Sequence, residues 1–156
     1  MDSTFRKYLA NLDANVDALL EAPAYAYPDL PVDGVPKAGI YLFSSAKRHL
    51  YVGRSNRIRG RLASHCRDSS RHNAASFAFR IAREKTGRLA AAYTTSESRA
   101  ALSGDPEFAE AFRAAKAYLR TLQIRFIKEE HQITQALLEI YAAVRLRTPY
   151  NDFATH

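Results

Sequence analysis

Apolar residues recur along the chain with two different periods, and each change of period marks the start of another expected element. From Phe5 to Leu20 they recur at helical spacing, which predicts a first helix capped by Ser3 or Thr4. Four prolines between residues 23 and 36 then interrupt regular structure. We therefore expect residues 1–37 to form an N-terminal helix and a proline-rich connector, and residues 38–153 to form the main domain.

Two short strands are expected next, because residues 39–44 and 50–52 alternate between the two faces of an extended chain. The short polar segment between them predicts a hairpin, and Gly53 is expected to end the second strand. A hairpin allows Tyr41 and Tyr51 to share one face of the sheet, although the sequence leaves the register open. A third strand is predicted where Leu122, Ile124 and Phe126 alternate with polar residues.

Helical periods and capping residues predict four further helices. One begins after Ser55 or Asn56, buries Ile58 and Leu62, and carries Arg57, Arg61 and His65 along a single face. Others are expected from Ser76 to Gly87 and from Asp105 onwards, separated by the polar stretch 94–105. The last is expected over His131 to Arg145, and its apolar stripe is Ile133, Ala136, Leu137, Ile140, Tyr141 and Val144.

Composition places the chain among globular proteins. It has 156 residues and 47% apolar residues, enough for one domain with a proper core. The single cysteine, Cys66, excludes an internal disulfide and a cysteine-cluster metal site, and it is compatible with a reducing cytoplasm. No apolar run approaches the ~18 residues of a membrane span. We expect a cytoplasmic protein that does not enter membranes.

Positive charge is concentrated in one segment. Between Lys47 and Arg71 there are eight Lys or Arg residues and one acid, Asp68, so this segment alone carries the +7 net charge of the whole chain. Such a local excess favours a polyanionic partner, and nucleic acid is preferred to a membrane surface because no lipid-binding amphipathic helix accompanies it. Arg54, Arg57 and Arg59 are assigned to phosphate contacts, with a solvated surface as the equally weighted alternative.

The polar residues of these elements match the needs of metal-assisted phosphodiester hydrolysis. The two tyrosines offer oxygen acids or bases, the arginine and histidine face can hold phosphate oxygens, and Glu139 lies off the apolar stripe of its helix as a hard oxygen ligand. Each feature also has an ordinary interpretation. Strand tyrosines usually pack, and helical arginines and glutamates are usually solvated.

A resemblance enters at the same residues. Gly39-Ile40-Tyr41, followed by Tyr51-Val52-Gly53, resembles the paired signature of the GIY-YIG nuclease family, with Val52 in place of the second isoleucine. As in that family, an arginine follows ten positions after the second tyrosine and a histidine four positions later, at Arg61 and His65. The segment LLEIYAAVRLRTPYN resembles the family's glutamate helix and following asparagine, which places them at Glu139 and Asn151. The likeness extends from Ala38 to Asn151.

The resemblance implies an α+β fold, with a small three-stranded antiparallel sheet flanked by helices, and a DNA endonuclease that uses one divalent metal. Glu139 would bind Mg²⁺ or Mn²⁺, Arg61 the scissile phosphate and Asn151 the nucleic acid. Tyr41 would help to deprotonate the attacking water, Tyr51 would orient the water or share the proton, and His65 would hydrogen-bond a tyrosine or a phosphate. Since a free phenol has a pKa near ~10, nearby arginines and the metal are expected to lower the tyrosine pKa. The interval from Phe77 to Pro106 is long, and its two segments look like additions whose role the family pattern does not give.

Two other classes of function stay open at this stage. One is a non-catalytic nucleic-acid-binding module with the same fold, which would bind DNA in a salt-sensitive way without turnover. The other is a protein-interaction domain that uses its N-terminal helix. For a nuclease, the sequence does not indicate which DNA is cut, so specificity is expected to come from a homodimer, a partner protein or structure in the DNA itself.

Overall fold

The computed structural model describes residues 1–88 and 98–154, and it divides the chain into two compact units. The first, here called the sheet unit, comprises Met1–Arg61 and Leu122–Asn151. The second, the helical unit, comprises Leu62–Thr121 and Asp152–His156. The beginning of the polar stretch predicted at residues 94–105 lies outside the described residues. The predicted division into residues 1–37 and 38–153 stays a prediction.

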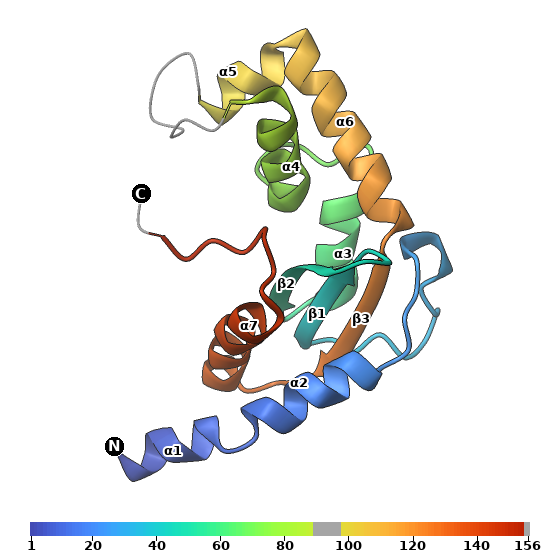
Figure 1. The fold of residues 1–156 in the computed structure, drawn as a ribbon. Helices are drawn as coiled ribbons and strands as arrows, with labels where there is room; N and C mark the ends of the chain where they lie inside the picture. The colour runs from blue at the N-terminus through green and yellow to red at the C-terminus, as the bar shows by residue number, and fades with distance from the viewer. Residues whose placement is uncertain (89–97, 155–156) are drawn as a thin grey trace. The chain divides into compact units, whose positions relative to one another are not determined.

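The sheet unit is built on three antiparallel strands in the order β2-β1-β3. They are β1 (Gly39–Ser44), β2 (His49–Ser55) and β3 (Gln123–Lys128), and Figure 1 shows β1 in the middle. Every residue of β1 is buried, since both of its edges are paired and both of its faces are covered. This arrangement confirms the small antiparallel sheet with flanking helices that the sequence predicted.

The strand register answers a question that the sequence left open. Tyr41 lies opposite Gly53, and Phe43 lies opposite Tyr51. Because side chains alternate along each strand, Tyr41 and Tyr51 therefore lie on the same face of the sheet. The expected end of the second strand at Gly53 is wrong. β2 continues to Ser55, because its last two residues still pair with Ile40 and Gly39 of β1.

The predicted first helix is two helices, α1 (Ser3–Leu9) and α2 (Leu12–Glu21). Asp2, rather than Ser3 or Thr4, caps α1, and its side chain accepts a hydrogen bond from the Phe5 amide at 2.9 Å. A short 3-10 turn, η1 (Tyr27–Asp29), follows in the connector. Tyr25 of the same connector exchanges two backbone hydrogen bonds with Ile124, which ties the connector to β3.

One face of the sheet is covered by α2 and α7 (Gln132–Leu146), as Figure 1 shows. Their buried side chains meet those of Ile40 and Leu42, which point to this face of β1. Burying such a cluster is the main stabilising contribution to a fold of this size. Its members are Leu12, Val16, Leu19, Ile40, Leu42, Val52, Leu138 and Ala142.

The buried face of α7 differs from the predicted apolar stripe. Ile133 and Ile140 are each 46% exposed and Val144 is 68% exposed, whereas Leu138 is fully buried. The buried side also carries Gln135, whose amide donates hydrogen bonds to the Glu129 carbonyl at 2.6 Å and to Asn56 Oδ1 at 3.1 Å. Leu137 and Tyr141 of the predicted stripe do pack against the core cluster. The stripe is otherwise displaced, because a hydrogen-bonded glutamine can occupy a core position that a pattern of apolar residues leaves out.

The helical unit contains α4 (Ser76–Thr86), α5 (Arg99–Gly104) and α6 (Pro106–Thr121), while α3 (Ile58–Cys66) begins in the sheet unit and ends here. Gly87 ends α4 with a left-handed φ of 69°, and Asp105 caps α6 by accepting from the Phe108 amide at 3.1 Å, as predicted. The end of the expected polar stretch is the helix α5. The core of the unit is formed by Phe79, Ala82, Leu102 and Phe108.

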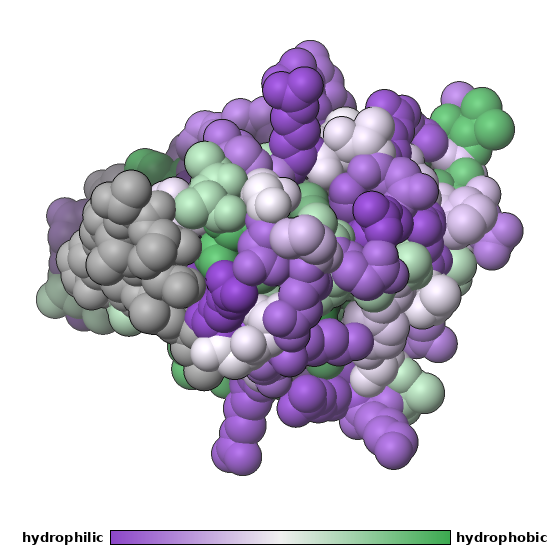
Figure 2. Space-filling model, turned by 90° about the horizontal axis from the view of Figure 1, so that it is seen from above, coloured by the Kyte–Doolittle hydropathy of each residue, from purple (hydrophilic) through white to green (hydrophobic). Residues whose placement is uncertain are grey.

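Among the described residues, no helix has the length and apolar character that a membrane crossing needs. The face seen in Figure 2 carries mainly hydrophilic side chains, with apolar residues in small separate patches.

Candidate active site

The sheet unit holds a polar pocket of about 260 Å³. It draws on β1, β2, the start of α3 and α7, which are far apart in sequence. The structure brings five of the sequence-predicted residues to this one place, namely Tyr41, Tyr51, Arg54, Arg61 and Glu139. The remaining lining residues are Ser55, Asn56, Gln132 and Gln135.

Tyr41 reaches the pocket because its partner in the sheet has no side chain. A Cβ atom at Gly53 would lie 2.2 Å from the Tyr41 hydroxyl oxygen and 2.3 Å from the ring carbon that bears it. The ring therefore lies across β2 in the space that any other residue would fill. Gly39 has a comparable role on the other edge, since a Cβ there would lie 1.9 Å from the carbonyl oxygen of Ile127 in β3.

Arg61 joins the two tyrosines. Its guanidinium hydrogen-bonds the hydroxyl groups of both Tyr41 and Tyr51, whose ring centroids are 6.3 Å apart. Burial raises the pKa of Tyr41 well above its ordinary value, and neighbouring Tyr51 adds to this, while Arg61 acts in the opposite direction. Burial also raises the pKa of Tyr51. The lowering by arginine that the sequence suggested is present, but burial outweighs it, and both tyrosines are neutral phenols in the protein alone.

Glu139 extends from α7 and forms an ion pair with Arg54 of β2. The distance from Arg54 Nε to Glu139 Oε2 is 3.0 Å, and the carboxylate side chain is 22% exposed. Burial raises the pKa of Glu139, and both Arg54 and Arg61 oppose this by favouring the charged form. The carboxylate is thus a partly desolvated negative charge compensated by two arginines.

Three amide side chains line the same pocket, and the sequence analysis missed all of them. Asn56 and Gln132 exchange hydrogen bonds, from Asn56 Nδ2 to Gln132 Oε1 at 3.1 Å and from Gln132 Nε2 to Asn56 Oδ1 at 2.8 Å. Gln135 donates to the same Asn56 oxygen. Amides carry no charge pattern, so the only signal was the position of Gln132 and Gln135 one or two turns before Glu139 in α7.

The residues of the pocket fit a magnesium-type cation. Among residues 1–88 and 98–154, no cluster of three or more His, Cys, Asp or Glu side chains is placed to hold a metal. A single carboxylate in a polar pocket suits Mg²⁺ or Mn²⁺, because Mg²⁺ keeps several waters and commonly takes one or two protein carboxylates together with substrate phosphate oxygens. Glu139 is the carboxylate that lines this pocket.

His65 lies one turn after Arg61 in α3, within the helical unit. Its side chain is fully buried, and its ring lies edge-on to Phe77 with centroids 6.2 Å apart. The described lining of the pocket does not include His65. Its expected hydrogen bond to a tyrosine or a phosphate stays a prediction.

Asn151 faces the backbone of β2. Its Oδ1 accepts from the Val52 amide at 2.8 Å, and its Nδ2 donates to the Val52 carbonyl at 2.7 Å. Thr148 Oγ1 donates to the same oxygen at 2.7 Å. The amide therefore continues the hydrogen bonding of the sheet at the outer edge of β2, between the positions of Tyr51 and Gly53, and supports the strand that carries Tyr51.

The other two predicted arginines lie outside the pocket lining that the structure describes. Arg59 donates hydrogen bonds to the carbonyls of Pro31 and Val32, the latter at 2.9 Å, and so holds the connector to α3. Arg57 is exposed at the start of α3, where the Ser55 hydroxyl accepts from its backbone amide at 2.9 Å. Of the three arginines assigned to phosphate contacts, Arg54 alone lines the pocket.

Comparison with known proteins gives one match. A family model described as the GIY-YIG catalytic domain matches residues 37–103. The matched segment includes β1, β2 and α3, with Tyr41, Tyr51 and Arg61, and it ends before β3 and α7. Neither a curated protein nor a solved structure matches the chain significantly. The match confirms the resemblance at the two tyrosine motifs, whereas Glu139 is placed with them by the geometry of the pocket.

Proposed function

We propose, from the match of residues 37–103 to the catalytic domain of the GIY-YIG nuclease family, that this chain is a divalent-metal-dependent DNA endonuclease that hydrolyses phosphodiester bonds by water attack. One observation supports this proposal above the others. Tyr41, Tyr51, Arg61 and Glu139 come from four different elements and line one polar pocket. A phosphodiesterase needs a phosphate-binding cation, a proton acceptor and a metal ligand within reach of one phosphate, and this set provides all three.

Arg61 binds the scissile phosphate in this proposal. A guanidinium offers several N–H donors in a fixed plane, which suits the oxygens of a phosphodiester and the charge that develops on them. Its hydrogen bonds to Tyr41 and Tyr51 hold the side chain in one orientation before the substrate arrives. Less ordering is then needed in the transition state.

Tyr41 and Tyr51 handle the attacking water. Tyr51 orients it or shares the proton, and Tyr41, after losing its own proton to solvent, accepts the proton of the water. Because burial raises the pKa of Tyr41, the phenolate requires additional positive charge in the pocket. Mg²⁺ or Mn²⁺ held by Glu139 would supply that charge and would polarise the phosphate oxygens. His65 is retained in this proposal as a hydrogen-bonding residue.

The nucleic acid is held by further basic and polar side chains. We assign Arg54, Arg57 and Arg59 to backbone phosphates, with Asn151 as a further contact. Arg54 changes partners in this scheme, since it neutralises Glu139 in the protein alone. Selectivity for particular DNA is assigned to a homodimer, a partner protein or DNA structure. A cytoplasmic location fits the one buried free thiol, Cys66.

The decisive experiment is cleavage of supercoiled plasmid in the presence of Mg²⁺ or Mn²⁺, followed by mapping of the ends. We expect the wild type to nick the plasmid, and Glu139→Gln to bind DNA without cutting it. Arg61→Ala should lower the cleavage rate by ~10²–10³-fold, as the loss of one transition-state donor does elsewhere. The measured quantity is the initial rate of nicking at saturating protein.

Glu130→Gln is the matched control. It makes the same chemical change in an exposed glutamate that lies outside the described pocket lining, and its nicking rate should equal that of the wild type. Metal-stimulated nicking that persists in Glu139→Gln would show that Glu139 is not the metal ligand. DNA binding without turnover in any divalent metal would instead support the alternative, a non-catalytic nucleic-acid-binding module.

A further inference from the structure

The helical unit has a cleft of its own, with a volume of about 540 Å³. It is formed by the loop that follows α3 and by α5 and α6. The lining includes Ser69, Ser70 and Arg71 from the loop, and Phe112, Arg113 and Lys116 from α6. The family match, which covers residues 37–103, includes the loop and most of α5 but not α6. The cleft is large enough for a phosphate group with its sugar, since ligand pockets commonly measure ~300–1,000 Å³.

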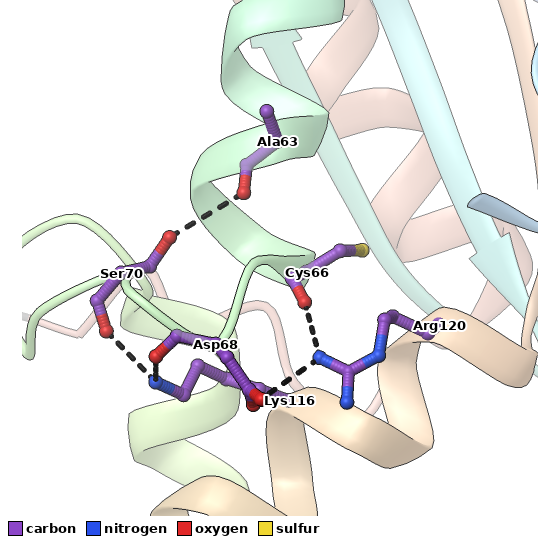
Figure 3. A network of polar contacts seen from close by, with 6 residues as sticks. All are labelled: Ala63, Cys66, Asp68, Ser70, Lys116 and Arg120. Atoms are coloured by element: carbon purple, nitrogen blue, oxygen red, sulfur yellow. Dashed lines mark hydrogen bonds and ion pairs between the residues drawn. The ribbon is translucent and has the colours of Figure 1, made fainter. Parts of the chain in front are cut away.

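The loop side of this cleft is fixed to α6 by two cationic side chains, as Figure 3 shows. Lys116 donates hydrogen bonds to the carbonyls of Asp68 and Ser70, the latter at 2.9 Å. Arg120 donates to the Cys66 carbonyl at 2.7 Å. These bonds hold residues 66–70 in one conformation, so the cleft needs little rearrangement to bind a ligand.

The charge in the cleft is positive. Arg71 and Arg113 are exposed cations, and Lys116 is a third, only 4% exposed. For the Arg71 guanidinium, the described residues provide no hydrogen-bond or ion-pair partner, and Arg113 pairs with Glu110 on its own helix. The one acid in the lining, Asp68, has Arg120 at 3.5 Å. An anion in the cleft would therefore meet more positive than negative charge.

Two features favour phosphate over a carboxylate ligand. Ser69 and Ser70 belong to the lining, and the Ser70 hydroxyl already donates to the Ala63 carbonyl at 3.4 Å. Phosphate offers more acceptor oxygens than a carboxylate does for the arginines and for the exposed Ser69. Burial lowers the pKa of Lys116, Asp68 opposes this, and Arg113 and Arg120 lower the pKa further. A bound dianion or phosphodiester would relieve this crowding of like charges.

Nucleic acid is favoured as the source of the phosphate. The basic segment 47–71 that gives the chain its net charge ends at Arg71, so the same run of sequence supplies Arg61 to the pocket and Arg71 to the cleft. We propose that the cleft of the helical unit is a second phosphate-binding site, in which Arg71 and Arg113 hold the backbone of the nucleic acid substrate. This inference rests on the proposed nuclease function and gives the helical unit a part in substrate binding.

The test measures binding of a fluorescein-labelled DNA duplex by anisotropy in EDTA, over a range of salt concentrations. For Arg71→Gln/Arg113→Gln, two lost phosphate contacts should reduce the slope of log K against log salt by about 2. The control, Lys7→Gln/Lys85→Gln, removes two exposed lysines that line neither cavity, and its slope should match the wild type. All four side chains are exposed, so both variants should fold, which thermal unfolding would verify.

A slope equal to that of the wild type in Arg71→Gln/Arg113→Gln would overturn the proposal. So would tight binding of inorganic phosphate or a mononucleotide that needs Arg71 and Arg113 while the DNA slope is unchanged, since the cleft would then serve a small ligand. If the slope is unchanged but nicking still requires Glu139, the cleft assignment fails and the nuclease proposal stands. If the wild type nicks no plasmid with any divalent metal, the proposed function itself fails.

Discussion

Tyr41 reaches the pocket by lying across the backbone of Gly53. The glycine of the second motif is needed there because any side chain would occupy the space of the Tyr41 ring. Replacing it changes the position of another residue's hydroxyl group, because a Cβ would lie 2.2 Å from that oxygen. At the scale of single residues, the two tyrosine motifs therefore depend on each other. The glycine of the second motif makes room for the tyrosine of the first.

Gly53→Ala tests this dependence. The added methyl group must displace the buried Tyr41 ring, and overpacking of this kind costs about 1–3 kcal/mol. We expect a fall in the free energy of unfolding in urea and a larger fall in nicking activity. Gly60→Ala is the control, since its Cβ would have only Arg57 Cβ nearby, at 4.0 Å, and alanine favours the helix by ~0.5–1 kcal/mol. Equal behaviour of the two variants would contradict the account.

Glu139 gives a pH-dependent prediction for the protein without metal. Burial raises the pKa of Glu139, so the folded state disfavours its charged form relative to the unfolded state. This destabilisation of the folded state is absent below the unfolded pKa of ~4.3. It grows as the pH rises from there towards the raised folded pKa, and it is complete above that pKa. We therefore expect Glu139→Gln to raise the Tm at pH 7, and we expect the gain to vanish near pH 4.

Scanning calorimetry in EDTA at the two pH values measures this difference directly. Glu130→Gln is again the reference, because no comparable gain is expected from an exposed glutamate. A Glu139→Gln protein that is no more stable than the wild type at pH 7 would show that Arg54 and Arg61 fully compensate the buried charge. A stabilised variant that has lost cleavage would show that the site is maintained at a cost in stability.

At the scale of elements, one side of α7 has two functions. Leu138 and Ala142 pack into the core of the sheet unit, and Glu139 and Gln135 line the pocket. The large residues Ile140 and Val144 lie on the exposed side. The orientation of the helix about its axis thus sets the position of the proposed metal ligand, and the core residues fix that orientation.

Alanine substitutions on α7 test whether the buried face is the one in the structure or the apolar stripe predicted from the sequence. Leu138→Ala should lower the free energy of unfolding by about 2–5 kcal/mol, because the residue is fully buried. Ile140→Ala should cost under ~1 kcal/mol, because the side chain is 46% exposed. Urea denaturation of both variants gives the comparison. A larger loss of unfolding free energy for Ile140→Ala than for Leu138→Ala would support the buried stripe that the sequence predicted.

At the scale of the whole molecule, locally encoded features were the ones that could be predicted from sequence. The hairpin, the end of α4 at Gly87 and the cap of α6 at Asp105 depend on neighbouring residues, and each is found in the structure. The tyrosine motifs and Arg61 were identified through a family resemblance, which the match to residues 37–103 confirms.

Features that depend on distant partners could not be predicted. Glu139 was identified, but its pairing with Arg54 requires α7 and β2 to meet. The amide of Asn151 binds the backbone of β2, and a contact to backbone atoms leaves no pattern of residue types in the sequence. Gln135 occupies a core position because Asn56 and the Glu129 carbonyl satisfy its amide, so hydropathy placed the wrong residues inside.

The placement of Glu139 on the last helix has a consequence during protein synthesis. A nascent chain emerges from the ribosome N-terminus first, at ~5–20 residues per second. Tyr41, Tyr51 and Arg61 are therefore exposed to the cell well before β3 can pair with β1 and before α7 is made. An incomplete chain carries the basic segment but lacks the proposed metal ligand. On the proposed assignment, a chain made in this order carries the phosphate-binding residues before it carries the metal ligand, so cutting has to wait for the synthesis of α7.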